Sequence, residues 1–337
     1  MRISSNGVGQ MGAVIDERRL ESKRRTDDLK THLRDAEALC GGKACVYMTG
    51  SFARGEAHKY SDLDLFIVGQ DSEGKRELKR LDEIRIKADL IEATQMLGIP
   101  EFSGDGRYLE HYTLHQLTGT LGKPEDDVTN TFTARLLLLL ESQPLLESAV
   151  YSKVTEEVIG AYWQDYVDHK NDFTPAFLAN DILRLWRTFC VNYEARTARQ
   201  PEQEKAKRKL KNYKLKYSRL LTCYSALLFL LAVHAQKRTV NPEDAVQMIG
   251  MTPTQRLEWI IAEPGLKNAH EKVAGLISSY EEFLSNTAQS EADLVARFLD
   301  REVSRTYFDR AARFGDQIFD VIEILGQRKQ LHRLLVV

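Results

Sequence analysis

Two aspartates and a glycine-serine turn form the segment of this chain with the clearest capacity for chemistry. Gly50 and Ser51 stand after one short apolar run, and Asp62 and Asp64 stand at the start of another. Side chains alternate along a strand, so Asp62 and Asp64 point to the same face, where two like charges repel each other unless a cation lies between them. Magnesium is the natural cation because it is hard and prefers oxygen ligands, and manganese shares that preference. The pattern therefore predicts a divalent metal site.

The turn itself is suited to phosphate. The runs 45–48 and 63–68 on either side are typical of buried strands, which places Gly50 and Ser51 at a strand end. A glycine lets the backbone approach a triphosphate closely, and the hydroxyl or amide of Ser51 can donate a hydrogen bond to it. The alternative is an ordinary turn beside a solvated strand end.

The pattern from Gly50 to Asp64 resembles the signature of the polymerase-beta nucleotidyltransferase superfamily, in which a Gly-Ser turn precedes an Asp-x-Asp strand. The resemblance implies that Gly50 and Ser51 contact the phosphates of a nucleoside triphosphate such as ATP. It also implies that Asp62 and Asp64 bind the catalytic magnesium, or manganese, and that two ions take part. Two metal ions held by carboxylates are the usual means of stabilising displacement at a phosphate.

A further part of the same segment resembles one branch of that superfamily. Arg54, Gly55 and Glu56, together with Ser61, are similar to the branch that contains the uridylyltransferase of nitrogen-regulatory proteins. The resemblance implies that Arg54 is a nucleotide-site residue. It also ranks a regulatory protein first among the acceptors.

The superfamily normally adds a third carboxylate on a neighbouring strand, and the sequence leaves its identity open. Glu101 and Asp105 follow the helix predicted after the Asp-x-Asp strand, which is the expected place, and Asp105 is preferred. The alternative for Asp105 is a plain Gly-Asp-Gly turn. Glu141 is a weaker candidate, because its position at the end of a helix favours a capping or packing role.

Basic residues in the C-terminal half are candidates for holding the triphosphate. Arg184 lies on a predicted helix, and Lys211 and Lys214 belong to a basic run over 205–219. Related enzymes use basic residues of their helical domain in this way, so these three side chains are expected to contact the nucleotide. A solvated helix face is the alternative for most of the run.

Composition excludes several classes of protein. The 337 residues carry a formal charge of −2, which argues against bulk electrostatic binding to nucleic acid or to a membrane surface. The N-terminus lacks the features of a signal peptide, and the apolar run 220–234 is too short to span a bilayer, so we expect a cytoplasmic protein. The glycines at 7–12 match a dinucleotide-binding pattern but lack the preceding strand.

Strand patterns occur only in the first part of the chain, which predicts an α+β protein. A small mixed sheet and its helices are expected over 1–150 as the nucleotidyltransferase domain, and 151–337 is expected to be an all-helical domain that binds substrate and closes the cleft. The pattern further predicts helices over 13–39, 75–97 and 107–121, a weak strand over 99–103, and a helix from Asp126 or Asp127 through Glu141.

These observations predict a magnesium-dependent nucleotidyltransferase that moves a nucleoside monophosphate from a triphosphate to an acceptor hydroxyl and releases pyrophosphate. The acceptor can be a regulatory protein, a second nucleotide, a small molecule or an RNA end, since the variable helical region reads it. Synthesis of a nucleotide second messenger and modification of a tRNA end are alternatives to protein modification. An alternative of another class is a nucleotide-binding regulatory protein without turnover.

Overall fold

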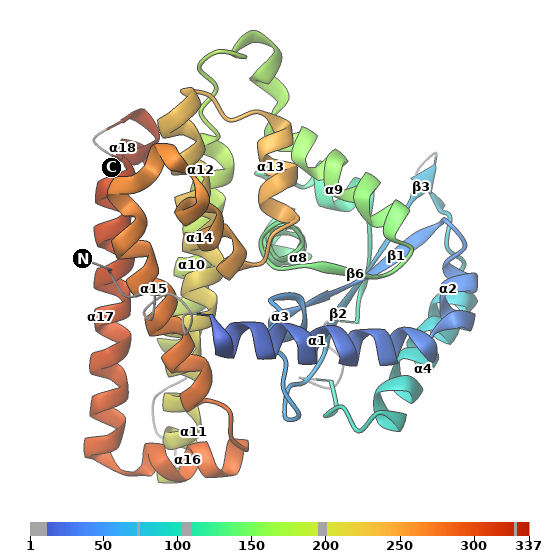
Figure 1. Ribbon diagram of the computed structural model, residues 1–337. Coiled ribbons are helices and arrows are strands. Elements are labelled where there is room, and N and C mark those ends of the chain that lie inside the picture. Colours follow the sequence, from blue (N-terminus) through green and yellow to red (C-terminus); the bar gives the residue numbers. More distant parts are fainter. Residues whose placement is uncertain (1–11, 73–74, 103–108, 195–200, 327–328, 337) are drawn as a thin grey trace, which may run out of the picture.

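The computed structural model describes residues 12–72, 75–102, 109–194, 201–326 and 329–336. It confirms the predicted α+β class, because a small mixed sheet in the N-terminal part is followed by a large assembly of helices (Figure 1). The main sheet has four strands in the order β5-β2-β1-β6. Their bounds are Ala44–Thr49 for β1, Asp64–Gly69 for β2, His111–Thr113 for β5 and Gln143–Leu146 for β6.

The two central strands carry the predicted site at one end. β1 and β2 pair antiparallel, with Thr49 opposite Asp64. The chain leaves β1 through the short helix α3 (Gly50–Ala53) and returns through a loop to the start of β2. β5 runs parallel to β2, and β6 runs antiparallel to β1. The turn and the aspartates therefore meet at the same edge of the sheet.

The two faces of the sheet are buried in different cores. Val46 and Leu65 belong to a smaller core with α2 (Arg34–Cys40) and α4 (Arg80–Met96). Tyr47 and Phe66 point the other way and stack with ring centroids 5.4 Å apart, within the large core shared with the helical half. Because side chains alternate, Asp64 lies on the face of Phe66, which is the face turned towards the helical half.

Three predicted helices are interrupted by other structure. The segment 13–39 forms α1 (Ala13–Thr31) and α2, which are separated at His32 and Leu33. The segment 75–97 begins with β4 (Lys75–Arg76), which pairs with β3 (Asp71–Ser72), before α4. The helix predicted up to Glu141 consists of α7 (Glu125–Val128) and α8 (Thr131–Leu140), because Asn130 adopts a positive φ of 58° between them.

The helix predicted over 107–121 is wrong in its first part. His111–Thr113 forms strand β5, and only Leu114–Gly119 is helical, as α6. Pairing with β2 is a long-range interaction that local helical periodicity does not report. No strand forms over 99–102, the described part of the weak strand prediction. Strand β6 was missed because Pro144 suggested a break, although proline is tolerated on an edge strand such as this one.

The C-terminal half of the described chain is helical. α17 and α15 lie side by side at its outer side, and α12 and α10 lie nearer the sheet (Figure 1). The elements are α9 (Ser148–Tyr162), η1 (Gln164–Asp168), α10 (Ala176–Glu194), α11 (Glu202–Lys214), η2 (Leu215–Arg219), α12 (Leu220–Lys237), α13 (Pro242–Ile249), α14 (Pro253–Ala262), η3 (Pro264–Leu266), α15 (Lys267–Asn286), α16 (Glu291–Leu299), α17 (Arg301–Gly326) and α18 (Gln330–Val336).

α11, η2 and α12 form one continuous helix, Glu202–Lys237, with a π-helical turn at η2. By length and composition alone this helix could cross a membrane, but 72% of its apolar window is buried inside the fold. The apolar residues of α12 are thus accounted for by packing against α14 and α17.

α1 joins the two halves of the molecule (Figure 1). Its first backbone N–H groups are capped by Glu281 of α15, which accepts from Gly12 at 3.0 Å and from Val14 at 3.1 Å. Arg19 reaches Glu258 of α14 at 2.7 Å. Further along the helix, Arg25 donates to the backbone carbonyl of His58 in the loop before β2. The helix thus fixes that loop relative to the helical half.

Candidate active site

The Gly50 turn and Asp64 face each other across the β1–β2 pair. Gly50 has a φ of +70°, and a Cβ atom built on it would lie 3.2 Å from Oδ2 of Asp64. The aspartate therefore occupies the space that any side chain at position 50 would need. Ser51 follows in the first turn of α3 with a partly exposed side chain. The structure thus brings Gly50, Ser51 and Asp64 together at one edge of the sheet.

Replacing Gly50 by alanine is expected to lower the free energy of unfolding by about 1–2 kcal/mol, because the left-handed conformation disfavours a Cβ atom. The new methyl group also displaces the Asp64 carboxylate, so any activity that depends on this carboxylate falls as well. Urea unfolding followed by circular dichroism measures the first effect. Gly160→Ala is the matched control, since no atom lies within 4 Å of its Cβ position on α9 and its φ is ordinary. A Gly50→Ala protein as stable as the wild type would contradict the strain argument.

The edge between the two strands fits a divalent cation. Thr49 is opposite Asp64, so both side chains lie on one face. The Thr49 side chain is 1% exposed, and its hydroxyl finds no hydrogen-bond partner within the described part of the chain. A buried polar atom without a partner is costly, and an ion or its bound water next to Asp64 would satisfy it. Asp62 is exposed and Asp64 half-buried, which leaves both carboxylates accessible.

The residues that the structure describes do not complete a metal-binding set of three carboxylates. Across these residues, no group of three or more His, Cys, Asp or Glu side chains is gathered closely enough to hold a metal ion. Asp105, the preferred candidate, lies outside the described residues. Glu101 is exposed and belongs to no strand.

Sequence reasoning missed Glu110, because its surroundings were predicted as helix. Its carbonyl accepts from the Ile67 amide at 3.4 Å, and its carboxylate accepts from the Tyr112 hydroxyl at 3.1 Å. Tyr112 in turn lies 6.2 Å from Phe66 between ring centroids. Glu110 therefore lies beside β2, directly before β5, with its carboxylate on the side of Tyr112. The alternation of Leu109 to Thr113 was the available signal for this strand.

Arg54 lies in a buried network of charges directly below the turn. Its Nε donates to Glu56 at 2.7 Å, and one terminal nitrogen donates to Glu141 at 2.9 Å. Burial opposes the charge on Arg54, but Glu56 and Tyr280 outweigh that effect, and the pKa of the guanidinium is raised. The side chain is thus fixed by two carboxylates. Its expected contact with the nucleotide stays a prediction.

Glu141 is the centre of this network. Its fully buried carboxylate accepts from the Gly50 amide at 3.3 Å and from the Thr222 hydroxyl at 2.7 Å, and it also pairs with Arg219. Thr222 and Arg219 belong to the continuous helix of the other half, at and just after its π-helical turn. The sequence favoured a capping or packing role for Glu141. In the structure, Glu141 connects the Gly50 turn to the helical half.

Lys214 comes from the same helix and approaches the aspartates. Burial lowers its pKa, while the negative charges of Glu291 and Asp62 act in the opposite direction. Asp62 is thus close enough to act electrostatically on Lys214. Lys211, one turn earlier, is exposed and lowers the pKa of Lys214 further.

Arg184 has a different set of neighbours. Its guanidinium donates to both carboxylate oxygens of Asp127, at 2.5 and 2.6 Å, and lies over the Phe132 ring at 4.0 Å. These contacts connect α10 to α7 and α8. They give no contact with the Gly50 turn.

One family comparison bears on this geometry. Residues 29–97 match the family model of the nucleotidyltransferase domain. This segment of the chain is therefore similar to a nucleotidyltransferase domain. The match covers both aspartates, the Gly50 turn and Arg54, and it ends before β5, Glu110 and the helical half. No curated protein matches the chain.

Proposed function

We propose that the protein transfers a nucleoside monophosphate from a nucleoside triphosphate to an acceptor hydroxyl, with magnesium and with release of pyrophosphate. The observation that carries the proposal is the close approach of Gly50 to Asp64, within the segment that matches the nucleotidyltransferase domain. A turn that lacks a side chain beside two accessible aspartates can accept a phosphate and its counterion together.

Some residues of the site would hold or supply positive charge at the phosphates, and others would orient the triphosphate. Asp62 and Asp64 would hold the metal, which supplies positive charge at the phosphates and favours loss of the acceptor proton. The Gly50–Ser51 turn orients the triphosphate, and Lys214 adds positive charge opposite Asp62. The acceptor oxygen forms a bond to the α-phosphorus. The bond between the α-phosphorus and the oxygen that bridges it to the β-phosphate breaks, and pyrophosphate leaves with the electron pair of that bond. The hydroxyl proton passes to a carboxylate or to solvent.

Asp105 remains our candidate for a third carboxylate, with Glu110 as a further position beside β2. Glu110 directly precedes β5, and its carboxylate lies at Tyr112. The described acidic and histidine side chains, however, form no group of three that could hold a metal ion.

The acceptor is less constrained than the donor. The resemblance to the uridylyltransferase branch ranks a regulatory protein first, but it depends on Arg54 and Glu56. Both side chains are buried and paired with each other, so they carry no information about the acceptor. A second nucleotide, a small molecule and an RNA end therefore stay in the proposal.

The experiment offers each of the four nucleoside triphosphates, labelled at the α-phosphate, with magnesium and a cell extract as the source of acceptors. We expect pyrophosphate release and a labelled product that mass spectrometry identifies. Release that persists in Asp62→Ala/Asp64→Ala would overturn the assignment of the aspartates. Nucleotide binding without any release would favour the regulatory alternative, which the incomplete set of described carboxylates also supports.

Lys214→Gln is expected to raise the KM for the triphosphate about tenfold and to leave the fold unchanged, because it removes about 1.4 kcal/mol of attraction to the phosphates. Lys267→Gln at the start of α15 is the control, since Lys267 is exposed and the change in charge is the same. An equal effect of the two substitutions would show that Lys214 acts only through net charge.

A further inference from the structure

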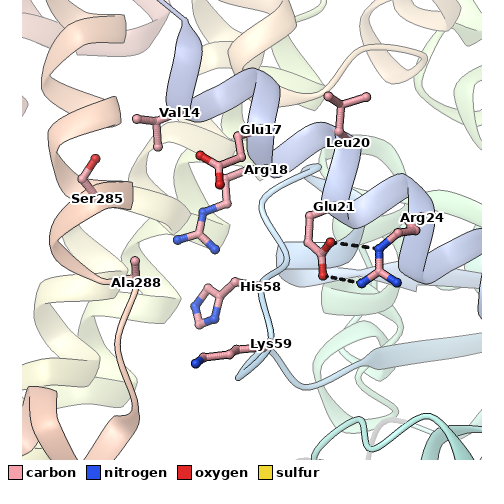
Figure 2. A pocket seen from close by; sticks show the side chains of 10 residues that line it. All are labelled: Val14, Glu17, Arg18, Leu20, Glu21, Arg24, His58, Lys59, Ser285 and Ala288. Carbon is pink, nitrogen blue, oxygen red and sulfur yellow. Dashed lines mark hydrogen bonds and ion pairs between the residues drawn. The ribbon is translucent and has the colours of Figure 1, made fainter.

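A cavity of about 730 Å³ lies beside the loop that leads to Asp62. α1 forms one wall, His58 and Lys59 of the loop form a second, and Ser285 and Ala288 at the end of α15 complete it (Figure 2). Its volume is within the usual range of small-molecule sites. The side chains that line it do not include the Gly50 turn, so the cavity is separate from the proposed triphosphate contacts.

Three basic side chains converge in this cavity. Figure 2 shows Arg18, His58 and Lys59 one beside another, with their nitrogen-bearing ends on the same side. Arg18 comes from α1, whereas His58 and Lys59 come from the loop only a few residues before Asp62. Whatever they bind therefore lies beside the loop that leads to Asp62.

These three basic side chains make no direct ion pair within the described part of the chain. Arg18, Arg25, Lys59 and Lys214 all act on His58. None of these four cations has a carboxylate within 4.0 Å among the residues that the structure describes. Desolvation of His58 and then these cations lower its pKa to about 4. An anion is the missing component of such a cluster.

The acidic side chains of the cavity do not pair directly with these cations. Glu21 receives two hydrogen bonds from Arg24, at 2.9 and 3.1 Å, so this pair is neutral. Glu17 acts on Arg18 through its charge but lies farther than 4.0 Å from it. Glu56 and Glu21 also act on Arg18 through their charges, but no described carboxylate pairs directly with Arg18 or Lys59.

His58 is held as a hydrogen-bond donor. Its Nδ1 accepts from the Tyr60 amide at 3.1 Å, so the neutral ring carries its proton on Nε2. The backbone on either side is fixed as well, since the His58 amide donates to Ser61 Oγ at 3.0 Å and Arg25 donates to the His58 carbonyl. A fixed N–H between a guanidinium and an ammonium group matches the several acceptor oxygens of a phosphate.

We propose that Arg18, His58 and Lys59 bind a phosphate group of the acceptor. The assignment to the acceptor rests on the proposed nucleotidyl transfer. The cavity lies beside the loop that leads to Asp62 and apart from the Gly50 turn, which is the proposed donor contact, and this position is the reason for assigning it to the second substrate. The binding of phosphate does not depend on it. The acceptor is then a phosphate-bearing molecule whose hydroxyl is presented to the aspartates from the side of α1.

The test follows the His58 ring by NMR in the full-length protein, with inorganic phosphate as the probe. The resonance is assigned by its loss in His58→Asn. A bound phosphate anion favours the protonated ring, so phosphate is expected to raise the pKa of His58 by roughly 1 to 3. The ring, neutral at about pH 5.5 without phosphate because its pKa is about 4, becomes partly protonated when phosphate is added.

Variants and a donor analogue decide between the possible sources of the phosphate. Arg18→Gln and Lys59→Gln are expected to weaken the response at least about tenfold in phosphate concentration. The double substitution Glu21→Gln/Arg24→Gln removes both members of a neutral pair on the same wall, so it keeps the response. The response is also expected to persist when magnesium and a non-cleavable triphosphate analogue saturate the donor site.

Each contrary result has a definite meaning. No response in the wild type, or an equal response in Arg18→Gln, overturns the site. If the triphosphate analogue abolishes the response, the acceptor assignment is overturned, and Arg18, His58 and Lys59 bind a phosphate of the donor triphosphate instead. Since the measurement requires no turnover, a protein that releases no pyrophosphate but responds to phosphate refutes the proposed transfer and leaves the phosphate site intact.

Discussion

Replacing Asp64 by asparagine is expected to lower kcat for pyrophosphate release by about 10³, whereas the free energy of unfolding changes little. The carboxylate stands at the edge of β2, half-buried and facing the Gly50 turn, where metal binding requires its negative charge. An asparagine of the same shape keeps the oxygen but not the charge, and a loss of about 4 kcal/mol in the transition state corresponds to this factor. Steady-state pyrophosphate release and thermal unfolding measure the two quantities.

The matched control for this prediction is Asp35→Asn. Asp35 is exposed on α2, so the substitution changes net charge equally without touching the site. We expect its kcat to equal that of the wild type. Magnesium titration adds a second readout, because Asp64→Asn is expected to shift the half-saturating concentration upwards and Asp35→Asn is not. Full activity of Asp64→Asn would remove the metal assignment from this edge of the sheet.

Replacing Glu141 by glutamine is expected to have the largest effect on stability, about 3 kcal/mol. The substitution keeps an acceptor for the Gly50 amide, but it leaves Arg54 with Glu56 as its one carboxylate partner among the described residues and removes the buried negative charge that pairs with Arg219. Breaking a buried pair by removing one partner is costly because the remaining charge is not solvated. Urea unfolding measures the change. Transfer activity of the folded fraction is expected to fall too, since the carboxylate anchors the turn to the helical half.

Glu157→Gln is the control for Glu141→Gln. Glu157 is exposed on α9, and its substitution is expected to change the free energy of unfolding by less than about 0.5 kcal/mol. A second comparison uses Thr222→Val, which removes one neutral donor to Glu141 and is expected to cost about 1 kcal/mol. If Glu141→Gln matched the wild type in stability, the network would be dispensable for joining the two halves.

Local patterns were sufficient for the central strands. The apolar runs on either side of the Gly50 turn and the Asp-x-Asp pattern are local signals, and β1 and β2 lie where they were expected. β5 and β6 were missed because their strand character depends on partners far away in the sequence. A three-residue strand beside β2 and an edge strand with Pro144 have no local pattern strong enough to predict them.

The candidate site divides in the same way. The sequence by itself determined the class of donor chemistry, since the turn and the two aspartates lie within a few residues of one another and backbone geometry relates them. Only the tertiary structure showed that Glu141 joins the turn to the π-helical region and that Asp62 acts electrostatically on Lys214. It alone brought Arg18 to His58 and Lys59. Electrostatic contacts between distant segments depend on how helices pack, and packing follows from the whole core rather than from any local pattern.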